Sequence, residues 1–205
     1  MGLYHDRLLP WLIDRAMRSA VLAPYRHGAV VPARGRILEI GIGSGHNLGL
    51  YGEAAAEVVG IDVSAGLLAR AAREAARGHA RVHLVRADAA SLPFAEASFD
   101  AAVLTWTLCS LPEPEAALAG IRRVLKPGGV LHYVEHGRAP EPAVRRLQDR
   151  LTPLWRRLSG GCHLNREIDA LIEGAGFRLD DRAAAYATGP RFLGYFYTGR
   201  AVADG

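Results

Sequence analysis

Short apolar runs alternate with segments of helical spacing along the first two thirds of this 205-residue chain. The runs have the length of strands and are rich in Val, Ile and Leu, and they predict strands at residues 36–40, 57–61, 81–86, 99–104 and 130–134. Helical spacing and helix-starting signals predict helices at residues 8–22, 47–51, 65–77 and 113–125. Because buried strands that alternate with helices form parallel sheets, we expect one sheet with helices on both faces.

The pattern changes in the last third of the chain. An arginine-studded segment at residues 144–158 and a helix at residues 166–175 come first. Two closing strands follow, near residues 177–186 and 191–202. The Gly-Pro pair at residues 189–190 is a turn signal, so we expect these two strands to form an antiparallel hairpin.

Chain length and composition favour one globular domain. Half of the residues are apolar and 22% are charged, which is too apolar for a disordered chain. A chain of this length buries a good core but rarely divides into two. Its longest nearly uncharged run, residues 101–111, is about half as long as the roughly 20 residues of a membrane span. We therefore predict no membrane span.

Charge and cysteine content indicate the cellular compartment and which kinds of site the chain can form. The net charge is +4, and Lys126 is the single lysine among 25 basic residues. Such an arginine excess fits phosphate binding or the base composition of the genome, and both interpretations stay open. Charged residues near the N-terminus interrupt the apolar stretch that a secretory signal peptide requires, so we expect no such signal. Cys109 and Cys162 are far apart in sequence, which argues against a disulfide scaffold or a four-ligand zinc site. We expect a cytoplasmic protein without a metal site.

The strongest motif is the glycine-rich turn after the first strand, LEIGIGSG at residues 38–45. Glycines there let a ligand approach the backbone closely. The dinucleotide fingerprint has a glycine at the sixth position of the turn, where this chain has His46. Glu39, just before the turn, would repel a pyrophosphate but attract a cation. These departures favour a positively charged adenosine compound over a dinucleotide.

Two further acids follow the next strands. Asp62 comes 21 residues after Gly41, the distance typical of an acid that accepts hydrogen bonds from ribose hydroxyls. Asp88 follows the third strand and is placed to meet an adenine edge. Each acid alone also fits a helix cap or a turn, but Ser64 already serves as the cap after Asp62.

The glycine-rich turn is followed along the chain by Asp62 and then Asp88. This series of motifs resembles that of class I S-adenosylmethionine-dependent methyltransferases. The resemblance covers about residues 36–135. It implies an α/β, Rossmann-like fold with a seven-stranded, mostly parallel sheet whose last strand is antiparallel. Around this core we expect a helical lid at residues 1–32 and an acceptor-side part at residues 136–205. The matching motifs are the glycine-rich turn, Asp62, Asp88, LPFAEASFD at residues 92–100 and LKPGG at residues 125–129.

The same resemblance implies the residues that bind S-adenosyl-L-methionine, whose product is S-adenosyl-L-homocysteine. The turn glycines would surround its methionine part, Asp62 would hold the ribose hydroxyls and Asp88 would accept from the adenine amine. Val63 and Ala89 would lie beside the adenine, and Thr105 near the transferred methyl group. The full implied set is Glu39, Gly41, Gly43, Gly45, Asn47, Asp62, Val63, Asp88, Ala89 and Thr105.

Methyl transfer requires an aligned nucleophile, and a base where the acceptor must lose a proton. Glu135 and His136 end the fifth strand at the carboxyl edge of the sheet, where ligands bind in open α/β folds. His163 lies in the GGCHLNR segment at residues 160–166. These three are the candidate catalytic residues. The alternative for each histidine is a structural role, which we also expect for Cys162.

The flanking segments indicate the acceptor. Basic residues accompany Trp11 and many aliphatic residues in the first helix, and arginines gather around Trp155. One interpretation is a lid packed on the sheet and a solvated arginine face; the other is a surface that meets anionic lipid at the inner membrane. The motifs VEH at residues 134–136 and GCHLNR at residues 161–166 resemble a subgroup with bacterial phospholipid N-methyltransferases and membrane-associated thiol methyltransferases. We predict a small, lipophilic acceptor, with a phospholipid headgroup amine favoured and a thiol or another small metabolite as alternatives.

Two alternatives belong to other classes of protein. One is a nucleic-acid-binding module, which the basic charge allows. The chain has no series of stacking aromatic residues and no recognised reading motif, and its positive charges are scattered, so we expect no nucleic-acid partner. The other is a cofactor-binding protein without catalysis. The sequence predicts no oligomeric state.

Overall fold

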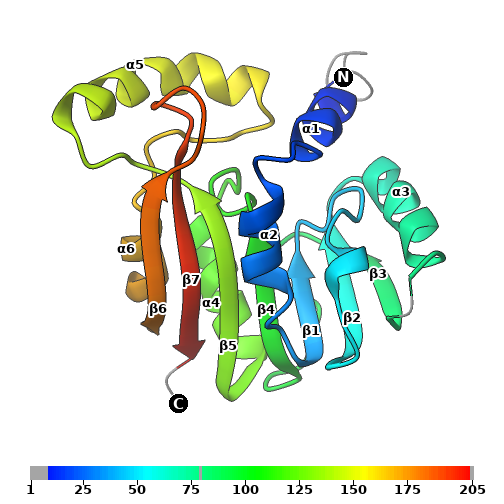
Figure 1. The fold of residues 1–205 in the computed structure, drawn as a ribbon. Helices are drawn as coiled ribbons and strands as arrows, with labels where there is room; N and C mark the ends of the chain where they lie inside the picture. Colours follow the sequence, from blue (N-terminus) through cyan, green and yellow to red (C-terminus); the bar gives the residue numbers. More distant parts are fainter. Residues whose placement is uncertain (1–8, 79, 204–205) are drawn as a thin grey trace.

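The computed structural model describes residues 9–78 and 80–203. Residues 1–8 of the predicted lid, with the first residue of the predicted helix at 8–22, lie outside that range. Within it the chain forms one seven-stranded sheet in the order β3-β2-β1-β4-β5-β7-β6 (Figure 1). The strands are β1 (Gly35–Ile40), β2 (Ala55–Asp62), β3 (Val82–Arg86), β4 (Phe99–Thr105), β5 (Leu125–His136), β6 (Phe177–Tyr186) and β7 (Tyr195–Ala203).

The first five strands pair in parallel, and β7 is antiparallel to both β5 and β6. This arrangement confirms the predicted fold class, including the closing hairpin. The helices are α1 (Leu9–Met17), α2 (Ala23–Val30), α3 (Ala65–Ala75), α4 (Pro114–Val124), α5 (Pro142–Leu158) and α6 (Ile168–Gly174), with a 3-10 helix η2 (Leu48–Leu50). In the described part of the chain, no helix has the length and apolar character needed to cross a membrane.

The two faces of the sheet each bury a separate apolar cluster. Ile37 and Val103 face the side of α2, where they pack with Val30. Leu38 and Leu104, their neighbours in sequence, face the opposite side, which α4 and α6 cover. Because both faces are buried, β1 and β4 need near-continuous apolar runs, which is the pattern that identified them as strands.

Helices α1 and α5 lie beyond the carboxyl ends of the parallel strands (Figure 1). Gln148, fully buried on α5, attaches this helix to the sheet. Its amide donates to the carbonyls of Gly137 at 3.1 Å and Phe192 at 3.2 Å, and it accepts the N–H of Ala139 at 3.0 Å. Both helices therefore border the edge at which the predicted site residues end.

The N-terminal segment differs from the prediction of one helix at residues 8–22. Helix α1 ends at Met17, and α2 begins at Ala23 with Pro24 in its first turn. Proline is favoured in the first turn of a helix because it needs no partner for an N–H group. Pro24 therefore starts a second helix in a segment for which the sequence predicted only a connection.

Candidate functional site

The glycine-rich turn uses backbone conformations that favour glycine. Gly41, Gly43 and Gly45 have φ angles of +68°, +56° and +85°. A Cβ atom on Gly41 would lie 2.5 Å from the Thr107 side chain, and one on Gly45 would lie 3.0 Å from Leu48. Both conformation and space therefore require glycine at Gly41 and Gly45. The turn packs directly against the loop that follows β4.

Asp62, the last residue of β2, holds this turn in place. One carboxylate oxygen accepts the N–H of Gly43 at 3.0 Å, and the other accepts the N–H of Ser64 at 2.8 Å. Burial raises the pKa of Asp62 above its ordinary value, although these backbone hydrogen bonds lower it. Val63, next along the chain, is 60% exposed and leaves an apolar surface open beside the carboxylate.

Asp88 lies at the same edge of the sheet as Asp62. It follows β3 by two residues, and Asp62 is in register with Arg86, the last residue of β3. The Asp88 carboxylate accepts the N–H of Ala90 at 3.0 Å and is exposed, whereas Ala89 is buried. The fold thus brings both acids to the carboxyl ends of two neighbouring strands, with Asp88 accessible to a ligand.

Glu39 is the centre of a buried polar network and is only 1% exposed. Its two oxygens accept hydrogen bonds from Asn47 Nδ2 and from the Tyr51 hydroxyl, both at 2.8 Å. Asn47 Nδ2 also donates to Thr105 Oγ1 at 3.1 Å. Burial outweighs these hydrogen bonds and raises the pKa of Glu39 to about 7. Three predicted residues are therefore connected, because Asn47 joins Glu39 to Thr105.

Arg26, on α2, completes this network and was not predicted from the sequence. Its Nη1 donates to Asn47 Oδ1 at 2.7 Å, and its Nη2 donates to the Met17 carbonyl at 2.9 Å. The guanidinium lies 5.1 Å from the ring centroid of Trp106. Burial lowers the pKa of Arg26, while the charge of Glu39 raises it. A cation thus lies near the buried acid without forming a direct ion pair.

Trp106 follows Thr105 and has an unusual backbone. Its φ angle is +52°, which is costly for a bulky residue. Its ring packs edge-on against Phe196, with centroids 5.7 Å apart. Within the described residues its buried indole N–H has no hydrogen-bond partner. Such strain persists only where the surroundings fix it, and it is frequent in active sites.

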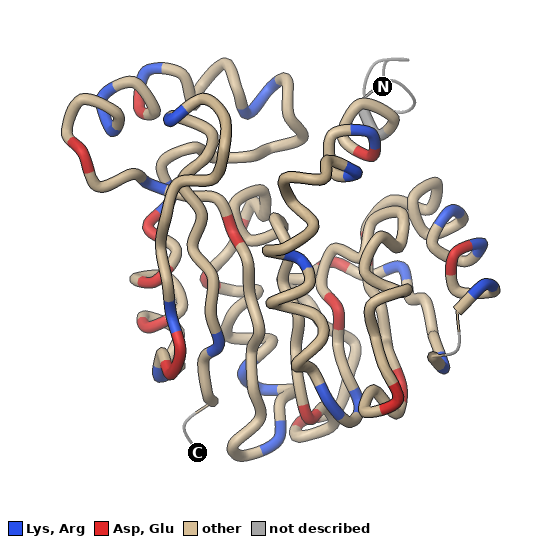
Figure 2. Tube along the Cα trace, viewed as in Figure 1, with Lys and Arg blue, Asp and Glu red and all other residues tan. Residues whose placement is uncertain are grey.

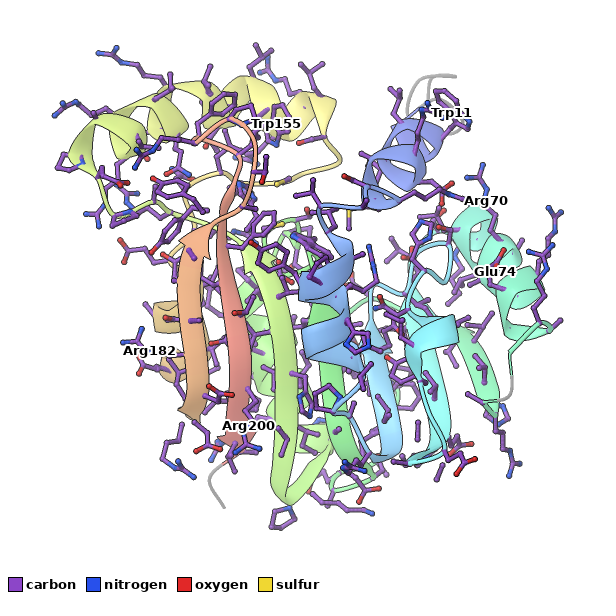
Figure 3. The ribbon with its side chains drawn as sticks, viewed as in Figure 1. Trp11, Arg70, Glu74, Trp155, Arg182 and Arg200 are labelled. Carbon is purple, nitrogen blue, oxygen red and sulfur yellow. The ribbon has the colours of Figure 1, made fainter. Side chains whose placement is uncertain are left out.

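Helix α1 is attached to the glycine-rich turn through Asp14. This carboxylate accepts a hydrogen bond from the Ser44 hydroxyl and lies 3.0 Å from His46 Nε2. Arg70 on α3, labelled in Figure 3, has its Nη1 3.8 Å from the other carboxylate oxygen of Asp14. Although burial acts to raise it, the pKa of Asp14 falls below its ordinary value because of the Ser44 hydrogen bond and the nearby positive charges. The network places α1 beside the turn.

Glu135, the first of the three catalytic candidates, anchors the loop after β4. It is fully buried. Its Oε1 accepts the N–H groups of Thr107 at 2.8 Å and Leu108 at 2.9 Å, and its Oε2 accepts that of Cys109 at 3.1 Å. Burial raises the pKa of Glu135 to about 7, against the effect of these bonds. With both oxygens engaged by backbone, this acid shapes the loop that carries Thr107.

Each of the two candidate histidines contacts one of two neighbouring cysteines. His136 is 5% exposed, and its Nδ1 is 3.4 Å from Cys162 Sγ. Its Nε2 is buried and has no partner within the described residues. His163 donates its backbone N–H to the Cys109 carbonyl at 2.8 Å. Glu135, both histidines and both cysteines therefore form one cluster, which the loop after β4 joins to the glycine-rich turn.

Comparison with known proteins agrees with this geometry. Residues 38–133 match the family model described as a methyltransferase domain. The ubiquinone/menaquinone biosynthesis C-methyltransferase of Syntrophotalea carbinolica is 36% identical over 194 residues, which is 92% of this chain and 76% of that protein. The thiol S-methyltransferase of Rattus norvegicus is 43% identical over 84 residues, or 40% of this chain and 34% of that protein.

A demethylmenaquinone methyltransferase of Clavibacter sepedonicus is 41% identical over 122 residues, or 59% of this chain. That match spans about half of the relative, 49% of its length.

Two solved structures show how widely the fold is used. A SAM-dependent methyltransferase of Methanosarcina mazei superposes with a TM-score of 0.67 at 24% identity, over 91% of this chain and 98% of that one. The [4+2]-cyclase SpnF superposes with a TM-score of 0.68 at 24% identity, over 95% of this chain and 80% of that one. The architecture alone does not determine the chemistry, which depends on the site residues.

Proposed function

Because this chain belongs to the class I S-adenosylmethionine-dependent methyltransferases, we propose that it methylates a small, lipophilic acceptor at the carboxyl edge of its sheet. The observation that carries the proposal is the meeting of the glycine-rich turn, Asp62 and the Glu39 network at that edge. Helices α1 and α5 border the same edge and would form the acceptor side.

The residues present fit S-adenosyl-L-methionine. Left-handed glycines give a ligand close access to the backbone, and Asp62 offers a carboxylate to ribose hydroxyls. A bound cation would favour the ionised form of the buried Glu39 and lower its pKa. When bound, the cofactor supplies an electrophilic methyl group. The chain's own residues then align the acceptor, because in-line transfer depends mainly on proximity and orientation.

We assign different roles to the three acceptor-side residues. Glu135 positions the loop after β4, since backbone N–H groups occupy both of its oxygens. His136 would orient the acceptor through its unpartnered Nε2. His163 lies in the adjoining segment and contacts the same loop at Cys109. His163 would help to orient the acceptor from that side.

Exposed apolar side chains on α1 and α5 support a lipophilic acceptor. Trp11 on α1 is 49% exposed and points away from the sheet (Figure 3), and Leu154 on α5 is 58% exposed. Arginines occupy several positions along α5, where Figure 2 marks basic residues in blue. An apolar surface with adjoining guanidinium groups suits a membrane surface with anionic lipid, and a lipid phosphate in particular. This combination favours a phospholipid headgroup amine as acceptor.

A thiol is the second candidate, favoured by the similarity to the rat thiol S-methyltransferase. A small lipophilic thiol would use the same apolar surface but would not need the arginines of α5. The two candidates therefore differ in their dependence on lipid phosphate.

The experiment is incubation of the protein with methyl-labelled cofactor and a set of acceptors. The set contains vesicles of phosphatidylethanolamine mixed with an anionic lipid, an alkyl thiol and a reduced quinone. We expect label in the lipid; label in the thiol or quinone alone would overturn the lipid assignment but not methyl transfer.

Asp62→Ala tests the cofactor site itself. The variant removes the carboxylate proposed to hold ribose and also releases the Gly43 N–H. We expect calorimetric affinity for S-adenosyl-L-methionine to fall by roughly 1–3 kcal/mol, the scale of an unmatched hydrogen-bonded polar pair. Asp180→Ala is the control, because Asp180 is exposed on β6 and pairs with Arg200. Equal affinity in both variants would remove Asp62 from the site.

A further inference from the structure

We propose that Cys109, His136 and Cys162 form a binding site for one thiophilic divalent ion of the Zn²⁺ type. The sulfur atoms of the two cysteines are 3.7 Å apart, and Cys162 Sγ is 3.4 Å from His136 Nδ1. One ligand atom from each of the three residues lies within 4.8 Å of the others. The proposal concerns ion binding and does not depend on the identity of the methyl acceptor.

Two of the three ligand separations match those around a tetrahedral ion. Zinc lies about 2.3 Å from a cysteine sulfur and about 2.0–2.1 Å from a histidine nitrogen. A tetrahedral angle between such bonds separates two sulfurs by about 3.8 Å and a sulfur from a nitrogen by about 3.6 Å. The observed 3.7 Å and 3.4 Å are close to these separations. Two thiolates and one imidazole also form a donor set that suits Zn²⁺.

Contacts with Glu135 and His163, which are not among the three proposed ligands, fix the backbone around those ligands. Glu135 accepts the N–H of Cys109, and the Cys109 carbonyl accepts the N–H of His163, the residue after Cys162. Gly161, just before Cys162, has a φ angle of +93°, and a Cβ there would lie 3.0 Å from the Ser110 carbonyl oxygen. Close backbone packing thus holds the two cysteine-bearing segments together and prepares the three side chains to bind an ion.

The unpartnered Nε2 of His136 is an independent observation. Buried polar atoms nearly always have a partner, so this one requires an explanation. Coordination through Nδ1 would fix the proton on Nε2, which would then donate to a water or to the acceptor. Three protein ligands would leave the fourth position of the ion open, as in catalytic zinc sites. On binding, each cysteine thiol would release its proton to solvent as its sulfur bonds to the ion.

The test uses the whole chain, reduced and freed of metal by a chelator, and titrated with Co²⁺ as a spectroscopic substitute for Zn²⁺. We expect one ion per chain, with the visible bands of tetrahedral cobalt and a near-ultraviolet band of thiolate coordination, and displacement by Zn²⁺. Absence of binding, or binding without the thiolate band, would overturn the proposal. A cysteine pair that only forms a disulfide on air oxidation would also count against it.

Variants identify the ligands. Cys162→Ser, Cys109→Ser and His136→Gln should each weaken Zn²⁺ binding by more than about 100-fold, beyond the effect of losing an outer-shell partner. His83→Gln is the matched control, because His83 is on β3 and pairs with Glu57. Circular dichroism reports whether each variant is folded, and the partly exposed Cys162 is the substitution least disruptive to the core. Wild-type affinity in a folded Cys162→Ser protein would contradict the site.

Discussion

Glu39 combines complete burial with neutral hydrogen-bond partners, so its charge is costly in the folded protein. Its pKa of about 7 lies above the ordinary 4.5. The folded state therefore binds more protons than the unfolded state between these two values. The free energy of unfolding should fall as pH rises through this window, because the folded protein must hold an unfavourable carboxylate at higher pH.

Glu39→Gln should remove this dependence. A glutamine can accept from Asn47 with its oxygen and donate to the Tyr51 hydroxyl, so the network is preserved without charge. We expect the ionisation of Glu39 to lower the free energy of unfolding of the wild type by up to about 3 kcal/mol between about pH 5 and about pH 8. The variant should lack that part of the fall. Urea unfolding of both proteins at the two pH values measures the difference. An equal fall in the free energy of unfolding of both proteins would show that Glu39 has an ordinary pKa.

Single residues of the site divide into those the sequence identified and those it missed. The meeting of Glu39 and Thr105 at Asn47 could be anticipated, because motifs at strand ends meet at one sheet edge. The roles of Arg26 and Trp106 could not. A guanidinium placed over an indole 80 positions away, and a tryptophan with a left-handed backbone, depend on tertiary packing that no local pattern records.

Strand β7 enters the sheet between β5 and β6 with little room for side chains. Gly199, on β7, lies beside the register irregularity between Leu179 and Asp181. A Cβ there would be 2.1 Å from the Asp181 carbonyl oxygen and 3.0 Å from the Tyr133 hydroxyl. The closest of these atoms belongs to the backbone and cannot move without disturbing the hairpin.

Gly199→Ala should therefore destabilise the fold by about 1–3 kcal/mol, the usual cost of overpacking. Gly174→Ala, at the end of α6, is the control because a Cβ there meets no atom within 4 Å. Chemical denaturation of both variants compares them. A Gly199→Ala protein as stable as the control would mean that the hairpin adjusts at no cost.

Helices and strands were predicted well where turn or cap residues marked their ends. Apolar runs bounded by turns identified the strands, and Ser64 marked the start of α3, where its hydroxyl accepts the N–H of Leu67. The break between α1 and α2 was missed because alanine and leucine continue the helical spacing across it. The approach of Cys109 to Cys162 was also hidden, since 53 positions separate them in sequence.

For the whole molecule, the proposed lipid-facing side should be recognised by its charge. The exposed arginines of α5 are Arg146, Arg150, Arg156 and Arg157. Reversing Arg146 and Arg150 to glutamate should reduce binding to anionic vesicles by roughly 30-fold or more, at about 1 kcal/mol for each of the two lost positive charges near the surface. Arg81→Glu, at the amino edge of the sheet, should bind as the wild type does. Vesicle sedimentation measures this binding.

Equal vesicle binding by the Arg146/Arg150 double variant and by Arg81→Glu would contradict the assignment of α5 to the membrane. Raised salt should weaken wild-type binding to anionic vesicles, because exposed charges are screened. Vesicles of zwitterionic lipid alone should retain much less protein.

The attachment of α5 through Gln148 has an evolutionary consequence. The bonds from this side chain end on main-chain atoms, which any sequence provides. Helices joined in this way can diverge in nearly all their outward positions without disturbing the strands beneath them. Descendants of such a chain can thus acquire new substrates through substitutions on their outer helices while keeping the sheet edge and its proposed cofactor site unchanged.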